Sequence, residues 1–123
     1  MEHLAFTEKE KSALEALGVE AVILFGSRAL GLARANSDYD FGVLLKDKKI
    51  LRSHELEVET YNALYDLLSH VVNKLINIDI VFLEDAPAEL QAHVIKHGVP
   101  LYESRANAFS DFKEYVMLLC ADF

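Results

Sequence analysis

A glycine-serine pair and two closely spaced aspartates could act together on a nucleotide. The sequence runs Gly26-Ser27, ten further residues, and then Asp38-Tyr39-Asp40. Glycine lets a strand turn abruptly into a helix and lets a phosphate approach the backbone amides, and Ser27 adds a hydroxyl donor at the same place. The start of the following helix would add N–H groups and a partial positive charge. This turn therefore predicts a triphosphate-binding site.

The two aspartates predict a cation site beside the turn. Asp38 and Asp40 stand two positions apart at the start of an expected strand, where alternate side chains project from the same face. Proteins commonly hold Mg²⁺ with one or two carboxylates together with substrate phosphate oxygens. Two such ions would stabilise both the attacking and the leaving oxygen of an in-line displacement. The pattern therefore indicates a nucleotide–metal complex rather than a metal held by the protein alone.

A third carboxylate is expected from Asp79, which lies inside an apolar run at residues 78–82. Burying an unpaired carboxylate is costly, so a carboxylate in such a run needs a partner charge, which a metal ion would supply. The alternative is an edge-strand carboxylate that faces solvent. Arg28 is a candidate phosphate contact, although surface arginines in loops are common.

Hydrophobic spacing predicts the elements that must position these residues. Helices are expected over 7–17, 27–33, 55–74 and 87–96 and after residue 104, and strands over 19–25, 38–45, 78–83 and 99–102. Thr7 and Glu10 predict a capping box, and Glu84 and Asp85 are expected to cap the helix that begins near Pro87. This order predicts an α/β domain of the α+β type, with a single mixed β-sheet flanked by helices, whose strand order stays open.

Composition favours one soluble domain. The 123 residues, 52% of them hydrophobic, suffice for one core. No apolar run approaches the ~20 residues that span a bilayer, and the N-terminus lacks an export signal, so we expect a cytoplasmic protein that binds no membrane. The formal net charge of −8 argues against direct nucleic-acid binding and favours a basic protein partner. The single cysteine, Cys120, agrees with a reducing compartment.

Two features outside the motif each allow two interpretations. His93 and His97 have a spacing that could serve zinc, but a solvated helix face is the favoured explanation. The segment after residue 104 carries an amphipathic stripe that either packs on the domain or faces a partner subunit. Its members are Phe109, Phe112, Val116 and Leu119.

The Gly-Ser turn, the Asp-x-Asp strand and an aspartate on a later strand resemble the DNA polymerase β-like nucleotidyltransferase superfamily. The chain length resembles that of its minimal nucleotidyltransferase (MNT, MntA-like) members. The resemblance implies a polymerase β-like nucleotidyltransferase fold over residues 1–104, and residues 105–123 would form an amphipathic helix or tail that could bind a partner. It also implies that Gly26 and Ser27 hold the triphosphate, Asp38 and Asp40 the metals, and Asp79 the metal and the nucleophile.

The resemblance further implies Mg²⁺ as cofactor, ATP as substrate and a HEPN-domain toxin as partner. Its activity would be transfer of AMP from ATP to tyrosine hydroxyls of that toxin, with this chain as the antitoxin. About twenty residues follow the last expected strand, so the acceptor is expected on another macromolecule. Two alternatives stay open: an antitoxin that acts by occlusion alone, and a small-molecule nucleotidyltransferase of the aminoglycoside-modifying kind.

Overall fold

The central feature of the fold is one mixed β-sheet, seen in a computed structural model that describes residues 4–119. The strands are β1 (Val19–Phe25), β2 (Tyr39–Leu45), β3 (Ile78–Phe82) and β4 (Val99–Glu103), in the spatial order β3-β2-β1-β4. β1 pairs antiparallel with β2 and β4, whereas β2 and β3 pair in parallel. The predicted single mixed sheet is confirmed, and β3 lies at one edge of it.

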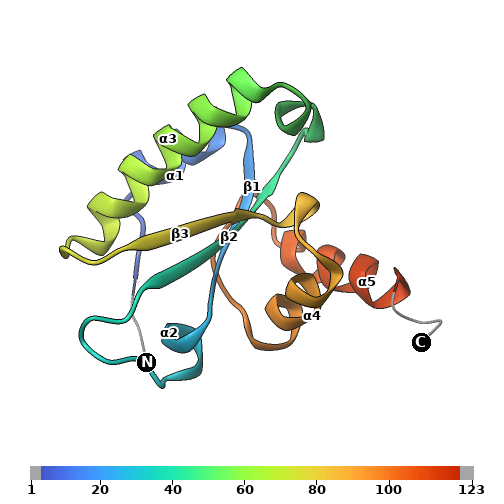
Figure 1. Cartoon of the computed structure of the whole chain (residues 1–123). Helices are drawn as coiled ribbons and strands as arrows, with labels where there is room; N and C mark the ends of the chain where they lie inside the picture. Colours follow the sequence, from blue (N-terminus) through green and yellow to red (C-terminus); the bar gives the residue numbers. More distant parts are fainter. Residues whose placement is uncertain (1–3, 120–123) are drawn as a thin grey trace.

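Helices cover both faces of the sheet. α1 (Glu8–Ala16) and α3 (His54–Val72) lie on one face, and α4 (Ala88–His97) and α5 (Ala108–Leu119) lie on the other (Figure 1). The remaining elements are a single helical turn, α2 (Ser27–Leu30), and two 3₁₀ turns, η1 (Lys48–Arg52) and η2 (Leu83–Asp85). Because β1 and β2 are covered on both sides, they consist almost entirely of buried side chains.

The two faces of the sheet hold separate hydrophobic clusters. On the α1/α3 face, Leu14, Leu64 and Leu68 pack against aromatic side chains of β2. On the other face, α5 inserts Phe109 and Phe112 beside α4. Phe109, Phe112 and Val116 therefore pack on the domain, which is one of the two expected interpretations of the stripe after residue 104, whereas its fourth member, Leu119, is 55% exposed. The division of the chain at residue 104 stays a prediction, and Cys120 lies outside the described residues.

Of the two capping predictions, one is confirmed and one is wrong. The Thr7 side chain accepts a hydrogen bond from the Glu10 N–H, and the Glu10 carboxylate accepts one from the Thr7 N–H, as in a capping box. α4 has Pro87 at its N-cap and no side-chain cap. Glu84 instead turns back onto β2 and accepts a hydrogen bond from the Leu45 N–H at 2.7 Å. Within residues 4–119, no helix is long and apolar enough to span a bilayer.

Candidate active site

The turn after β1 requires glycine for two separate reasons. Gly26 has φ 74° and ψ −159°, a backbone conformation that is essentially restricted to glycine. A Cβ at this position would also collide with the carboxylate of Asp40, whose Cγ would be 3.1 Å away. Ser27 then opens α2, which ends at Leu30 because Gly31 adopts a left-handed conformation with φ 73°. The helix is therefore shorter than the predicted 27–33.

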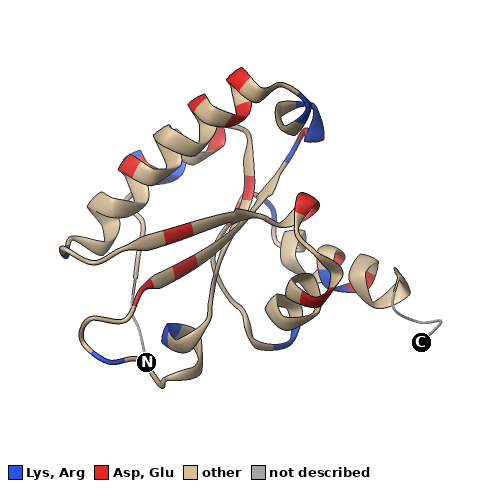
Figure 2. Ribbon diagram, viewed as in Figure 1, with Lys and Arg blue, Asp and Glu red and all other residues tan. Residues whose placement is uncertain are grey.

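Strand register places the aspartates of β2 and β3 beside this turn. Phe25 at the end of β1 pairs with Asp40 on β2, and Asp40 pairs with Asp79 on β3. Neighbouring strands are about 4.8 Å apart, and paired residues project from the same face. Gly26 directly follows Phe25 and lies against the Asp40 carboxylate, so Gly26, Asp40 and Asp79 form a short row from the turn after β1 across β2 to β3. Figure 2 shows the acidic segments of β2 and β3 side by side.

The carboxylates of this row strongly affect one another. Asp40 is half-buried, and this burial raises its pKa, as do the neighbouring negative charges of Asp79 and Asp38. A hydrogen bond from protonated Asp40 to Asp79 acts in the same direction, whereas His93 partly lowers the pKa. Like charges held together at a partly desolvated position favour uptake of a proton or of a cation. The site thus has the electrostatic character of a cation-binding centre.

Asp79 lies on the edge strand β3 and is exposed to solvent, so the expectation of a buried carboxylate is wrong and the alternative, an edge-strand carboxylate that faces solvent, describes its exposure. Asp38 is exposed as well, so solvent reaches both side chains. Within residues 4–119, no three His, Cys, Asp or Glu side chains are arranged to hold a metal ion by themselves. The carboxylate chemistry fits Mg²⁺, and the roles of individual ligands remain predictions.

Arg28 holds the loop that leads to Asp38. Only 5% of its side chain is exposed, and its guanidinium group lies 4.2 Å from the centre of the Tyr39 ring. Its Nη2 donates to the carbonyl oxygens of Ala35 at 3.1 Å and of Ser37 at 2.8 Å, and Nε also donates to Ser37. These bonds direct the guanidinium group toward the loop. The phosphate contact predicted for Arg28 stays a prediction.

His93 is a neighbour of the site that sequence reasoning missed. It projects from α4, and its ring lies 6.3 Å from the Phe25 ring and 5.0 Å from the His97 ring. Its charge acts on Asp40, so it borders the carboxylate row from the α4 side. The sequence indicates only its helical spacing from His97, because its approach to Asp40 depends on how α4 packs against β1.

Comparison with known proteins assigns this geometry to a family. The model of the family "Polymerase beta, Nucleotidyltransferase" matches residues 8–107. The chain is 30% identical over 105 residues to "Protein adenylyltransferase MntA" from Aphanizomenon flos-aquae, which covers 81% of this chain and 67% of that protein.

Solved structures agree on the fold. A toxin–antitoxin structure with AMP-PNP matches with a TM-score of 0.66 at 22% identity, over 94% of this chain and 89% of that chain. The structure of a tri-AMPylated HEPN toxin of Shewanella oneidensis in complex with MNT antitoxin also matches. Its TM-score is 0.57 at 18% identity, over 94% of this chain and 87% of that chain. The predicted polymerase β-like fold is confirmed, and the chain belongs to the polymerase β-like nucleotidyltransferases as a homologue of the MntA-like minimal members.

Proposed function

We propose that this chain is a protein adenylyltransferase that transfers AMP from ATP to a tyrosine hydroxyl of a HEPN-domain toxin and thereby acts as its antitoxin. The observation that carries the proposal is the row of Gly26, Asp40 and Asp79 on adjacent strands. Proteins similar to this chain support the chemistry, because one is a protein adenylyltransferase and another forms a complex with an AMPylated HEPN toxin. The cytoplasm, where ATP is abundant, is the compartment that we propose.

Three carboxylates would hold the cofactor. Asp38, Asp40 and Asp79 supply the hard oxygen ligands that Mg²⁺ prefers, and the pKa of Asp40 is raised first by its burial and then by the neighbouring charges of Asp79 and Asp38. When bound, two Mg²⁺ ions would neutralise the charge that develops on the phosphate oxygens during transfer. The triphosphate would lie against the backbone of Gly26 and the Ser27 hydroxyl, since the glycine leaves room for close approach.

The remaining chemistry is positioning and proton transfer. The tyrosine oxygen forms a bond to the α-phosphorus of ATP while the bond between that phosphorus and the pyrophosphate oxygen breaks. Asp79, at the β3 end of the row, orients the hydroxyl and accepts its proton. Pyrophosphate leaves on the side of Gly26 and Ser27. Most of the rate enhancement would come from orientation and charge neutralisation, because the protein forms no covalent intermediate.

The proposal is tested by incubating the chain with ATP labelled in the α-phosphate, Mg²⁺ and the protein encoded by the adjacent reading frame. The expected result is label on that protein, confined to tyrosine, and no transfer by the Asp40→Asn variant. Toxin neutralisation is measured in parallel. If Asp40→Asn neutralises the toxin as well as wild type does, occlusion replaces transfer as the function. Label on a small-molecule acceptor instead would indicate the aminoglycoside-modifying alternative.

A further inference from the structure

The order of residues across the sheet separates a donor side from an acceptor side of the site. This step rests on the function proposed above. Gly26 and Ser27 end β1, Asp40 lies on β2, and Asp79 lies on β3, the last strand of the sheet among the described residues. A triphosphate held at Gly26 and Ser27 occupies the β1 side of the row. The acceptor hydroxyl must therefore approach from the β3 side, past Asp79.

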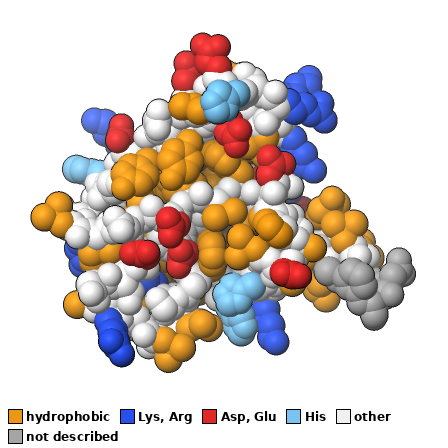
Figure 3. Space-filling view, in the orientation of Figure 1, with side chains coloured by type: hydrophobic (Ala, Val, Ile, Leu, Met, Phe, Trp, Pro, Cys, Tyr) orange, Lys and Arg blue, Asp and Glu red, His pale blue; other side chains and the backbone are white. Residues whose placement is uncertain are grey.

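A hydrophobic groove begins on that side, directly after Asp79 in β3. It has a volume of about 500 Å³ and lies between α3, β3 and the segment 85–87. Its apolar lining comes from Val58 and Tyr61 of α3, Ile80 and Phe82 of β3, and Pro87. Figure 3 views this edge of the molecule and shows hydrophobic side chains gathered above and beside the central acidic group.

The groove has the features of a site for a polypeptide segment. Val58 is 41% exposed, so an apolar side chain of the groove is accessible to a partner. No other strand among residues 4–119 pairs with the outer edge of β3, so the backbone N–H and C=O groups on that edge have no strand partner there. An extended segment can bind both to such an edge and to apolar side chains.

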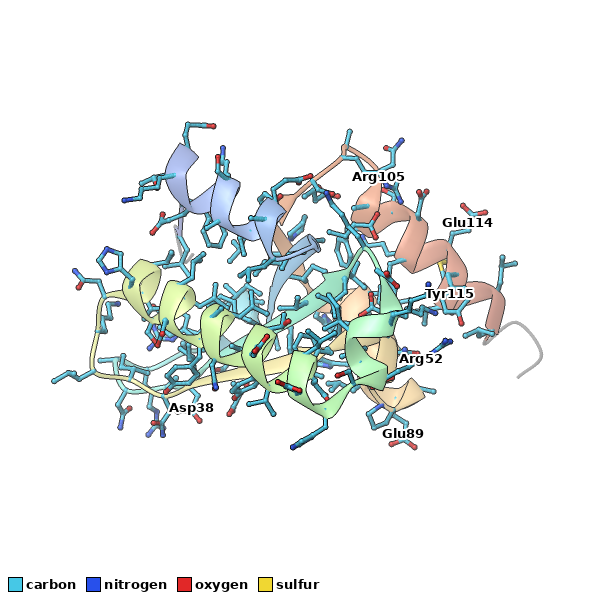
Figure 4. The ribbon with its side chains drawn as sticks, turned by 90° about the horizontal axis from the view of Figure 1, so that it is seen from above. Asp38, Arg52, Glu89, Arg105, Glu114 and Tyr115 are labelled. Atoms are coloured by element: carbon cyan, nitrogen blue, oxygen red, sulfur yellow. The ribbon has the colours of Figure 1, made fainter. Side chains whose placement is uncertain are left out.

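Charge determines which segment fits. Glu57 and Asp85 also line the groove, and the carboxylates of the active site lie at its Asp79 end. The chain as a whole carries a formal net charge of −8. An occupant with an apolar centre and basic flanking residues would complement this surface, whereas an acidic occupant or a nucleic acid would be repelled. A second exposed apolar surface, on α5, lies away from the active site. Its residue Tyr115 is across the molecule from Asp38 (Figure 4).

We propose that the groove between α3 and the free edge of β3 is the docking site for the acceptor protein. The bound segment is apolar with basic flanks, and it places its tyrosine hydroxyl beside Asp79. Nucleotide binding and acceptor binding are thus assigned to opposite ends of the same row of residues, and they can be perturbed independently.

The test compares two substitutions on the same helix. Val58→Lys places a cation inside the groove, and Leu56→Lys places one at a residue that is 47% exposed but does not line it. Both variants are assayed with the acceptor protein labelled in the experiment above, and their nucleotide affinity is measured with a non-hydrolysable ATP analogue. Val58→Lys should lower kcat/KM for the acceptor about tenfold or more, while its nucleotide affinity and the activity of Leu56→Lys stay near wild type.

A second variant keeps the groove testable if Val58→Lys folds poorly. Glu57→Lys reverses a charge at the groove, and it should raise the KM for the acceptor most strongly at low salt, because surface charges are screened as salt increases. If wild type labels the acceptor and the groove variants label it equally well, the docking proposal is overturned while the transfer function stands. If wild type labels no protein, the function itself fails, and the docking site falls with it.

Discussion

Replacing Gly26 by alanine adds one methyl group where β1 turns into α2, and its effects can be worked out from the structure. The backbone at φ 74° and ψ −159° costs a non-glycine residue roughly 1–3 kcal/mol. The new Cβ would also collide with the Asp40 carboxylate. Relief of this collision requires Asp40 to move away from its place between Gly26 and Asp79. A displacement of about 1 Å in a catalytic constellation costs about 100-fold in rate.

Gly31→Ala is the matched control for this experiment. Gly31 also has a positive φ, 73°, so alanine there costs roughly 1–2 kcal/mol of backbone strain. A Cβ at Gly31, however, has no neighbouring atom within 4 Å. Both variants should therefore lose stability in urea denaturation, Gly26→Ala at least as much as Gly31→Ala, whereas only Gly26→Ala should lose about 100-fold in AMP transfer. Equal transfer rates in the two variants would refute the claim that Gly26 makes room for Asp40.

Four further predictions follow from contacts of buried and half-buried charged side chains. Arg28→Met should cost about 2–3 kcal/mol of stability in urea denaturation, because the carbonyls of Ala35 and Ser37 lose a charged donor, and Arg28→Lys should recover only part of it. The pKa of Asp40, raised by burial and by Asp79 and Asp38, should exceed that of an ordinary aspartate when the metal-free protein is titrated by NMR, and Asp79→Asn should lower it. The same raised pKa means that folded Asp40 binds its proton more tightly than the unfolded chain does. In thermal unfolding at several pH values, the melting temperature of metal-free wild type should therefore fall relative to that of Asp40→Asn as the pH rises through the range in which carboxyl groups titrate. Glu84 likewise has a raised pKa from burial, and its Oε1 lacks a partner among the described residues, so Glu84→Gln should gain stability over wild type above neutral pH.

Several features of the site follow from local sequence, because they depend on interactions between residues close in the chain. The Gly26-Ser27 turn is one, since only glycine adopts its backbone conformation readily. The capping box of Thr7 and Glu10 is another, because its two hydrogen bonds span three residues. The alternation of helices and strands is of the same kind, since hydrophobic spacing within each segment produces it.

Other features depend on contacts between distant segments. Glu84 is predicted to cap α4, but its carboxylate bonds to β2, because η2 follows β3 beside the end of β2. The hydrogen bonds of Arg28 to loop carbonyls and its stacking on Tyr39 are another such feature, which the sequence does not indicate. Sequence spacing cannot identify such a partner, because a long side chain can contact any group that the tertiary structure places within its reach.

The amino-acid sequence by itself determined that a glycine turn and an Asp-x-Asp strand occur in one chain, because both depend on single residues and short spacings. Only the tertiary structure decided that Asp40 and Asp79 stand opposite each other, that His93 borders them, and that β3 is left as a free edge. The physical reason is strand order. Strand order depends on how the helices bury both faces of the sheet at once. The local hydrophobic pattern does not determine it, because each apolar strand of the chain fits that pattern equally well.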